Sequence, residues 1–477
     1  MSARASGLGG RVAVIAGTAA LGGFLFGYDS AVINGAVTAI QAEFSLSAGE
    51  LGFTVASALL GAAVGAWTTG SIAERLGRPR TMVVAAALFL VSAVLSGLAG
   101  SALLLVVWRV IGGFAVGMAS VIAPMYIAEV APADVRGRLG SLQQLAIVTG
   151  IFISQLVNLG IVELAGGDAS GSILGLDAWR WMLIVEALPA VLYAGLALRL
   201  PESPRYLVAR GRVEEARPVL ESLEGGDVDA EIEQIRASLE GEHAPRLRDL
   251  RGPAFGLHAI VWVGLVLSML QQLVGINVVF YYSASLWQSV GVDESRALLI
   301  SVVTAVVNIG GTVLAISIID RVGRRPLLLV GSAGMTVSLA VTAAAFSTAS
   351  VDAAGDAVLS QGAGRTAFVA ANAFVFFFAF SWGPVVWVLL GEMFPNRLRA
   401  SALAVAAAAQ WLTNFAVTQT FPRLSDTVGF GGAYTLYAVF ALVSLGFVWR
   451  FVAETKGRTL EEMGADVPPA AGVSSSA

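Results

Sequence analysis

Two ionisable residues stand in apolar stretches long enough to cross a membrane. Asp29 would lie about 12 residues, or about 18 Å, below the outer boundary near Gln41. Arg109 would lie about 9 residues, or about 13 Å, below the outer boundary near Gly100. A charge within a span costs about 2.5–3.5 kcal/mol, so each residue is a functional candidate. Because their depths match, we expect the two side chains to pair and to lower the cost of burying each other.

Only the carboxylate of this pair can change its charge near neutral pH, because the guanidinium stays protonated. When Asp29 takes up a proton, the pair loses its attraction and the helices that carry it can shift. We therefore interpret Asp29 and Arg109 as a proton-coupling device in which Asp29 carries the proton. A static ion pair that only fixes helix packing is the alternative.

Uncharged amides form a second set of polar side chains in the apolar stretches. They are Gln144, Gln271, Gln272, Asn277, Asn308, Gln410 and Asn414. Amides offer hydrogen-bond donors and acceptors together, as a neutral polyhydroxylated ligand does. Aromatic rings that could cover the C–H surfaces of such a ligand are Phe26, Tyr281, Trp387 and Trp411. Hydrogen bonds between helices are the alternative for any single amide, but seven amides without an acid among them favour a sugar-like site.

Several kinds of chemistry are not expected in this chain. Cys is absent, and the histidines are His243 and His258 alone, so we expect no disulfide, no thiolate chemistry and no metal site. No nucleophile and base are arranged together in the apolar stretches, which argues against an enzyme and against a cofactor. The net charge of −4 says little about partners, because in a membrane protein the position of charge matters more than its sum. Nucleic acid is not an expected partner.

The composition predicts an all-α polytopic membrane protein. Hydrophobic residues make up 56% of the chain and charged residues 13%, against about 25% charged in ordinary soluble domains. Apolar runs of about 20 residues can cross a hydrocarbon core about 30 Å thick. We expect twelve spans, at about 12–40, 51–73, 81–101, 103–128, 139–162, 180–200, 256–290, 297–319, 326–348, 365–393, 400–422 and 431–453.

The connectors between these runs predict the orientation of the chain. Arginines gather after the second, fourth, eighth and tenth runs, which places those loops in the cytoplasm, and the outer connectors are acidic or nearly uncharged. The first run is too long for a signal-peptide core, so we expect it to be retained. Both termini are then cytoplasmic.

The charges also divide the chain into regions. Residues 202–251 hold about a third of all charged residues, with apolar residues at helical spacing, which indicates short amphipathic helices on the cytoplasmic face. A flexible linker is the alternative. We therefore expect an N-terminal six-helix bundle (1–200), a cytoplasmic helical linker (201–252), a C-terminal six-helix bundle (253–463) and a disordered tail (464–477).

Internal repeats relate the two bundles. The segment 74–80, ERLGRPR, recurs as DRVGRRP at 320–326, which matches the second run to the eighth. Glu129, Pro132 and Arg136 recur with the same spacing as Glu392, Pro395 and Arg399, which matches the fourth run to the tenth. Two repeats in the same order predict two parallel six-helix halves, an arrangement suited to alternating access.

Longer motifs resemble the sugar porter family of the major facilitator superfamily from Gly22 to Met463. They are GYD at 27–29, RLGR at 75–78, PMYIAE at 124–129, PESPR at 201–205, QQLVGIN at 271–277, WGP at 382–384 and ETKGR at 454–458. The PESPR and QQxxGxN strings together are highly specific. The resemblance implies the major facilitator fold.

The resemblance also implies roles for individual residues. Sugar contacts would come from Gln144, Gln271, Gln272, Asn277, Asn308, Trp387, Gln410 and Trp411. A cytoplasmic salt-bridge set that holds the outward-open state would come from Arg75, Glu129, Arg136, Arg321, Glu392 and Arg399. Proton-coupled bacterial members are similar in having Asp and Arg at the places of Asp29 and Arg109, whereas mammalian facilitative glucose carriers have Asn at the first.

These features together predict proton-coupled import of a monosaccharide, D-glucose first, through a bacterial cytoplasmic membrane, by a lipid-embedded monomer. Ile151, where the xylose–proton symporter of the family has Gln, makes the pocket resemble that of glucose carriers. Glu74 in place of Asp and Ala453 in place of Pro are mild departures from the family pattern. A proton-independent facilitator, a symporter for xylose, galactose or inositol, and a non-transporting sugar sensor are the alternatives.

Overall fold

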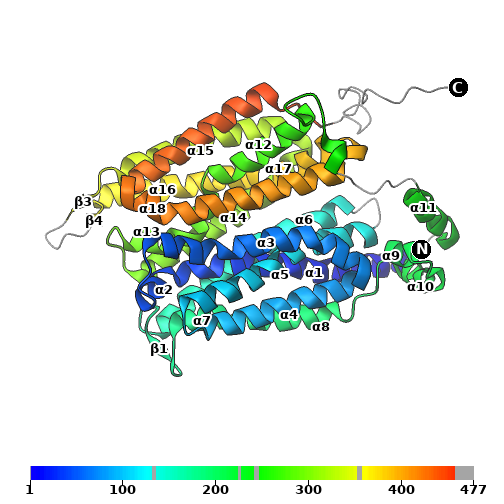
Figure 1. The fold of residues 1–477 in the computed structure, drawn as a ribbon, viewed down its shortest axis with the longest axis horizontal. Coiled ribbons are helices and arrows are strands. Elements are labelled where there is room, and N and C mark those ends of the chain that lie inside the picture. The colour runs from blue at the N-terminus through cyan, green and yellow to red at the C-terminus, as the bar shows by residue number, and fades with distance from the viewer. Residues whose placement is uncertain (1, 132–135, 224–226, 241–246, 352–356, 457–477) are drawn as a thin grey trace.

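The structure is a computed structural model of the 477-residue chain. It describes residues 2–131, 136–223, 227–240, 247–351 and 357–456, so the expected disordered tail at 464–477 lies outside the described residues. Long helices form two bundles that lie side by side, one from each half of the chain (Figure 1).

The N-terminal bundle contains the first six predicted spans. Its helices are α1 (Ser2–Val32), η1 (Ile33–Gly35), α2 (Val37–Glu43), α3 (Ala48–Leu76), α4 (Arg78–Gly97), α5 (Ala102–Val130), α6 (Arg136–Leu164), α7 (Ala178–Val185) and α8 (Ala187–Ala197). The first span is thus built from α1, η1 and α2, and the sixth from α7 and α8.

The C-terminal bundle contains the other six spans. Its helices are α12 (Ala259–Leu273), α13 (Ile276–Gln288), α14 (Glu294–Val322), α15 (Arg324–Phe346), α16 (Gln361–Phe377), the π turn η3 (Phe378–Trp382), α17 (Gly383–Met393) and α18 (Asn396–Phe451). Gly429, at φ 70° and ψ 169°, breaks α18 into two spans.

The membrane fold is confirmed. Ten helical stretches of the described residues are long and apolar enough to cross a membrane. With α1, and with the two parts of α18 counted separately, they give the predicted twelve. Large apolar side chains such as Leu103 (73% exposed), Val337 (64%) and Trp449 (69%) cover the outside of the bundles, as a lipid-facing surface requires.

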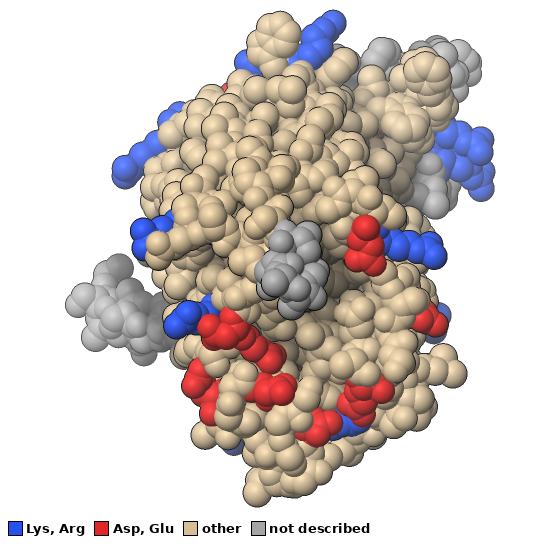
Figure 2. All heavy atoms as spheres, turned by 90° about the vertical axis from the view of Figure 1, so that its left-hand side faces the viewer, with Lys and Arg blue, Asp and Glu red and all other residues tan. Residues whose placement is uncertain are grey.

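The two ends of the bundles differ in structure and charge. At one end lie the short helices α9 (Pro204–Ala209), α10 (Val213–Leu223) and α11 (Val228–Glu240) of the segment expected as a linker (Figure 1). In the chain they are followed by η2 (Leu247–Leu250). At the other lie two antiparallel hairpins, β1 (Ser172–Ile173) with β2 (Leu176–Asp177) and β3 (Ser350–Val351) with β4 (Ala357–Val358). Acidic side chains gather on this second face over the N-terminal bundle (Figure 2), as expected for the outer connectors.

Close contact between α3 and α5 fixes the centre of the N-terminal bundle. Gly61 of α3 lies against the carbonyl of Val110, and Gly113 of α5 lies against the carbonyl of Ala58. Any side chain at these glycines would push the helices apart, as is usual where small residues let helix backbones approach in a membrane. The contact sets the position of Arg109, which lies one turn before Gly113 on α5.

Gly113→Ala tests this contact. The added Cβ would lie 1.8 Å from the carbonyl oxygen of Ala58, so the helices must separate, at a cost of about 1–3 kcal/mol. We expect a lower melting temperature of the detergent-purified protein. Gly70→Ala on α3 is the control, because nothing lies within 4 Å of its added Cβ. Equal melting temperatures for the two variants would contradict the packing argument.

Candidate functional site

Asp29 and Arg109 form a buried ion pair between α1 and α5. Nη1 of Arg109 donates to Oδ1 of Asp29 at 2.8 Å, and both guanidinium amino groups lie 3.4 Å from the Asp29 backbone carbonyl. The residues are 2% and 3% exposed. A pair so removed from water is stable only while both partners keep their charges.

A third ionisable residue, Glu186, joins this pair from the junction of α7 and α8. Glu186 is 2% exposed, and its carboxyl interacts with the carboxyl of Asp29. The sequence analysis missed it, although an acid in the apolar run 180–200 meets the criterion that identified Asp29. Its Oε1 atom has no hydrogen-bond partner among the described residues.

The charges of this cluster allow it to hold a proton. Two ionised carboxylates cannot hydrogen-bond to each other, since neither has a proton to donate. With one guanidinium, two carboxylates would also leave a net negative charge in a dry site, which is costly. One shared proton removes both difficulties. The cluster of Asp29, Arg109 and Glu186 can therefore hold a proton and release it.

A small cavity connects this cluster to the C-terminal bundle. Asp29, Ser30 and Arg109 line it together with apolar residues of α3 and with Tyr281 of α13. The Tyr281 side chain interacts with Ser30 of the N-terminal half and with Asn414 of α18 in the C-terminal half. A change at Asp29 can thus reach the C-terminal bundle through one tyrosine.

Three of the expected sugar-binding amides meet at a break in the seventh span. Asn277 donates to Gln272 at 2.5 Å, Gln272 donates to Gln271 at 3.3 Å, and Gln271 donates to the carbonyl of Trp382 at 2.7 Å. Gly275 makes the break: its φ of 81° is left-handed, and an added Cβ would lie 2.6 Å from the ring of Tyr437. The carbonyl that Gln271 satisfies belongs to the π turn η3, a feature common at functional sites.

The remaining expected sugar-binding residues lie on other helices. Gln410 and Trp411 are on α18. The Oε1 atom of Gln410 is buried without a hydrogen-bond partner among the described residues. The rings of Trp411 and of Phe26 on α1 pack with their centroids 5.7 Å apart. Gln144 on α6, Asn308 on α14 and Trp387 on α17 form no hydrogen bond to the span-seven amides in the part of the chain that the structure describes. Asn308 is 6% exposed, whereas Trp387 is 41% exposed.

Asn34 of η1 joins the two halves on the outer side of these residues. Its Nδ2 donates to Gln155 at 2.9 Å and to Ser301 at 3.0 Å, and its Oδ1 accepts from the Ala284 N–H at 3.0 Å. Ser301 and Ala284 belong to the C-terminal bundle, and Asn34 is 1% exposed. This asparagine was not a predicted site residue.

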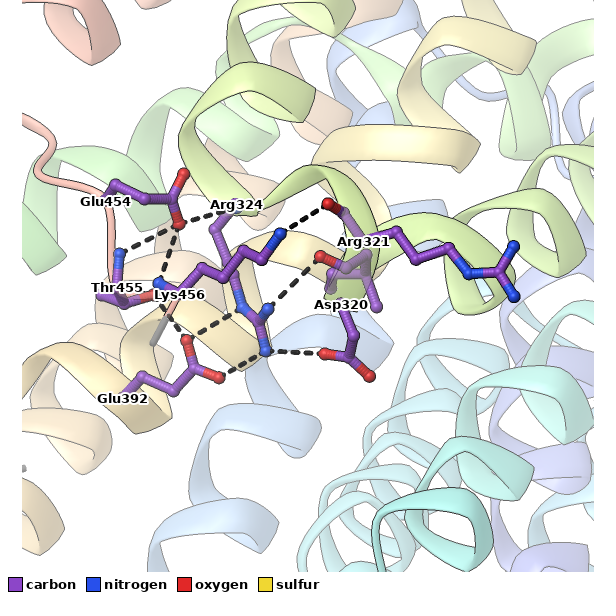
Figure 3. A network of polar contacts seen from close by, with 8 residues as sticks. Asp320, Arg321, Arg324, Glu392, Glu454, Thr455 and Lys456 are labelled. Atoms are coloured by element: carbon purple, nitrogen blue, oxygen red, sulfur yellow. Dashed lines mark hydrogen bonds and ion pairs between the residues drawn. The ribbon is translucent and has the colours of Figure 1, made fainter. Parts of the chain in front are cut away.

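Two equivalent networks lie at the linker end of the bundles, one in each half. In the N-terminal half, Arg78 makes a bidentate pair with Glu129, at 2.6 and 2.8 Å, and Glu202 accepts from the backbone N–H groups of Arg78 and Ser203. In the C-terminal half, Arg324 pairs with Glu392 at 2.7 and 3.0 Å (Figure 3).

Glu454 completes the C-terminal network. It accepts backbone N–H bonds from Arg324, Thr455 and Lys456 (Figure 3). A fourth comes from the N–H group of Arg325. Burial acts to raise the pKa of Glu454, but the four donors together hold that pKa below its ordinary value. Glu202 has only two such donors, and burial raises its pKa.

Glycine is required beside each of these two carboxylates. Gly77 and Gly323 have φ values of 88° and 103°, and their added Cβ atoms would lie 1.9 Å from Glu202 and 2.7 Å from Glu454. The carboxylates therefore sit directly against the first turns of α4 and α15, where anions are favoured. This explains why Gly precedes Arg in both repeats.

These networks use different arginines from those expected. The acids Glu129 and Glu392 pair with Arg78 and Arg324, while the Arg75 and Arg321 side chains are exposed. Arg399 donates to the carbonyl of Phe394, and the Arg136 side chain lies outside the described residues. The motif alone did not show which arginine begins a helix and so faces inward.

Comparisons with known proteins agree with this geometry. The chain matches the family described as "Sugar (and other) transporter" over residues 15–466. It is 55% identical to the glucose transport protein of Synechocystis sp., over 95% of this chain and 97% of that protein. It is 39% identical to the D-xylose-proton symporter of Escherichia coli, over 94% of each chain.

Solved structures of the Escherichia coli xylose transporter show the same fold. The inward-open conformation has a TM-score of 0.82 at 37% identity, covering 96% of this chain and 100% of the other. The proton:xylose symporter bound to 6-bromo-6-deoxy-D-glucose has a TM-score of 0.78 at 39% identity, covering 95% and 98%. This chain is a sugar transporter of the major facilitator superfamily.

Proposed function

We propose that this protein is a proton-coupled importer of a monosaccharide, with D-glucose as its substrate. The buried cluster of Asp29, Arg109 and Glu186 is the observation that supports the coupling, because two buried carboxyls beside one guanidinium can take up a single proton. The 55% identity to a glucose transport protein supports the choice of sugar.

In this proposal the amides bind the sugar hydroxyls. The unpartnered oxygen of Gln410 accepts from one hydroxyl, and the chain of Asn277, Gln272 and Gln271 rearranges to bond others. Gln144, Asn308, Trp387 and Trp411 complete the site. No charge is needed, because the substrate is neutral.

Protonation then changes the contact between the halves. A proton on Asp29 weakens its ion pair with Arg109, so that helix α1 can shift. The shift moves Ser30, and with it the hydroxyl of Tyr281 on α13. Because Tyr281 also bonds with Asn414 beside Gln410, sugar binding and proton binding favour the same movement. Coupling requires that the sugar and the proton each bind more favourably to one conformational state than to the other.

The described conformation supports an inward-facing state. Asn34 and the Ala169–Glu294 contact join the halves at the outer end. At the cytoplasmic end, the described ion pairs all lie within one half. We propose that the networks around Glu129 and Glu392 bridge the halves in the outward-open state, with Arg75, Arg136, Arg321 and Arg399 taking part.

The transport units in this proposal are residues 1–200 and 253–463, joined by 201–252. The protein works as a monomer in the lipid of the cytoplasmic membrane, with both termini in the cytoplasm. The arginine-rich connectors after even-numbered spans support this orientation.

Uptake of labelled glucose into proteoliposomes tests the proposal. We expect accumulation above the external concentration when an inward proton gradient is imposed, and its loss when a protonophore removes the gradient. Unlabelled xylose, galactose and inositol added in excess rank the substrates. Uptake that only equilibrates, with or without the gradient, would indicate a facilitator instead.

Asp29→Asn tests the assignment of the proton carrier. The amide is nearly isosteric but cannot take up a proton, so gradient-driven accumulation should be abolished while exchange of internal for external sugar continues. Asp426→Asn, at an exposed position, is the matched control and should accumulate normally. Accumulation by the Asp29 variant would refute the assignment.

Ile151→Gln tests the choice of sugar. Ile151 follows Gln144 by two helical turns on α6, so the new amide faces the same side. One added hydrogen bond of about 1 kcal/mol should improve competition by xylose about fivefold. Ile153→Gln places the amide on another face and should change nothing, and identical xylose competition in both variants would contradict the model of the pocket.

Asn34→Ala tests the outer closure. Losing two bonds between the halves, at about 1 kcal/mol each, should favour the outward-open state about tenfold or more. Because the chain lacks Cys, Ser30→Cys gives a single reporter, whose labelling by an impermeant maleimide from outside should speed up. Asn158→Ala, which loses a bond to Val32 within one half, is the control. Unchanged labelling would count against the closure.

A further inference from the structure

A string of buried polar atoms leads from the carboxyl pair toward the cytoplasmic end of the N-terminal bundle. Five of these atoms have no hydrogen-bond partner among the described residues: Glu186 Oε1, Tyr28 OH, Tyr193 OH, and Nε2 and Oε1 of Gln143. The four residues are 2%, 1%, 0% and 8% exposed, in the same order. They come from three adjacent helices, α1, α6 and the α7–α8 span.

The helix contacts place these residues at successive depths. Glu186 lies beside Asp29. Tyr193 follows Glu186 by seven residues in the sixth span, and its hydroxyl lies 2.8 Å from the position of a Cβ on Gly22. Gly22 likewise precedes Asp29 by seven residues on α1. Seven helical residues rise about 10 Å, so Tyr193 lies two turns on the cytoplasmic side of the carboxyl pair.

Gln143 and Tyr28 fill the same region. The Gln143 amide lies 2.8 Å from the position of a Cβ on Gly23, next to the level of Tyr193, and about two turns from the start of α6. Tyr28 interacts electrostatically with Glu186, and side chains on a helix lean toward its N-terminus, so its hydroxyl lies between the two levels.

This string does not belong to the small cavity beside Tyr281. That cavity is lined by Asp29, Arg109 and Tyr281, on the side of α1 that faces α3 and α13, and Glu186 is not among its lining residues. Glu186 reaches Asp29 from the side of the sixth span. The carboxyl pair thus has one member facing the Tyr281 cavity and one at the head of the string.

We propose that Tyr28, Tyr193 and Gln143 line a water-bearing route, separate from the Tyr281 cavity, through which the proton on the Asp29–Glu186 pair leaves for the cytoplasm. The proposal rests on the proposed function. Buried polar groups are satisfied by protein or by ordered water, and hydroxyls and amides hold water as both donors and acceptors.

The transfer balances as a simple proton relay. The O–H bond of the Glu186 carboxylic acid breaks, its proton joins the first water, and each water passes one of its own protons onward. A proton leaves the last water near Gln143, and Glu186 is left as a carboxylate. Arg109 then faces two carboxylates, those of Glu186 and Asp29. No group is oxidised or reduced.

Tyr193→Phe and Gln143→Leu test the route, with Tyr434→Phe as the matched control, a buried tyrosine of the other half. Each variant is reconstituted with a pH dye inside the vesicles. Sugar exchange between equal concentrations measures folding and sugar binding, and sugar-driven acidification of the lumen measures proton release. We expect both route variants to slow acidification by at least about tenfold at normal exchange, and the control to match the wild type.

Three results would separate the possible failures. Acidification at the wild-type rate in both route variants overturns the route. Exchange and acidification that fall in parallel in both variants also overturn it, because the residues then serve packing alone. A wild-type protein that exchanges sugar but moves no proton overturns the proposed function itself, and the route with it. If Tyr193→Phe alone does not fold, Gln143→Leu decides the question.

Discussion

One guanidinium buried against two carboxyls is the constraint on which the N-terminal half depends. Arg109 cannot lose its charge, so the dry site around it must always contain at least one carboxylate. Asp29 and Glu186 together exceed that need by one negative charge, which a single proton removes. The glycine contacts between α3 and α5 keep Arg109 at the required depth, and the Tyr281 bridge connects this charge balance to the other half.

The C-terminal half repeats the cytoplasmic network but not the charged cluster. Glu392 matches Glu129, and the same spacing matches Asn372 to Arg109. Asn372 lines a small neutral pocket and has a buried amide oxygen without a partner among the described residues. The two halves therefore share the contacts that hold helix ends and differ in what they bind. In the proposed function, proton binding belongs to one half, and most of the amides for sugar belong to the other.

Much of this architecture could be predicted from the sequence. Span lengths follow from hydrophobicity, the halves follow from repeats, and Asp29 and Arg109 stand out because charge is rare in apolar runs. Glu186 was within reach of the same criterion. The break at Gly275 could not be predicted, because the left-handed conformation of that residue depends on tertiary contacts. For the same reason, the sequence did not show that Arg78 rather than Arg75 pairs with Glu129. Which amides touch one another also depends on that break.

The central claim is that sugar and proton move together through a site whose charge changes by one. Electrometry on supported proteoliposomes measures this directly, as the charge displaced when glucose is added without any pre-existing gradient. The account predicts a glucose-dependent inward current of positive charge. This current should grow as the external pH falls toward the range in which the pair of Asp29 and Glu186 takes up its proton. Rapid glucose exchange without any displaced charge would contradict it.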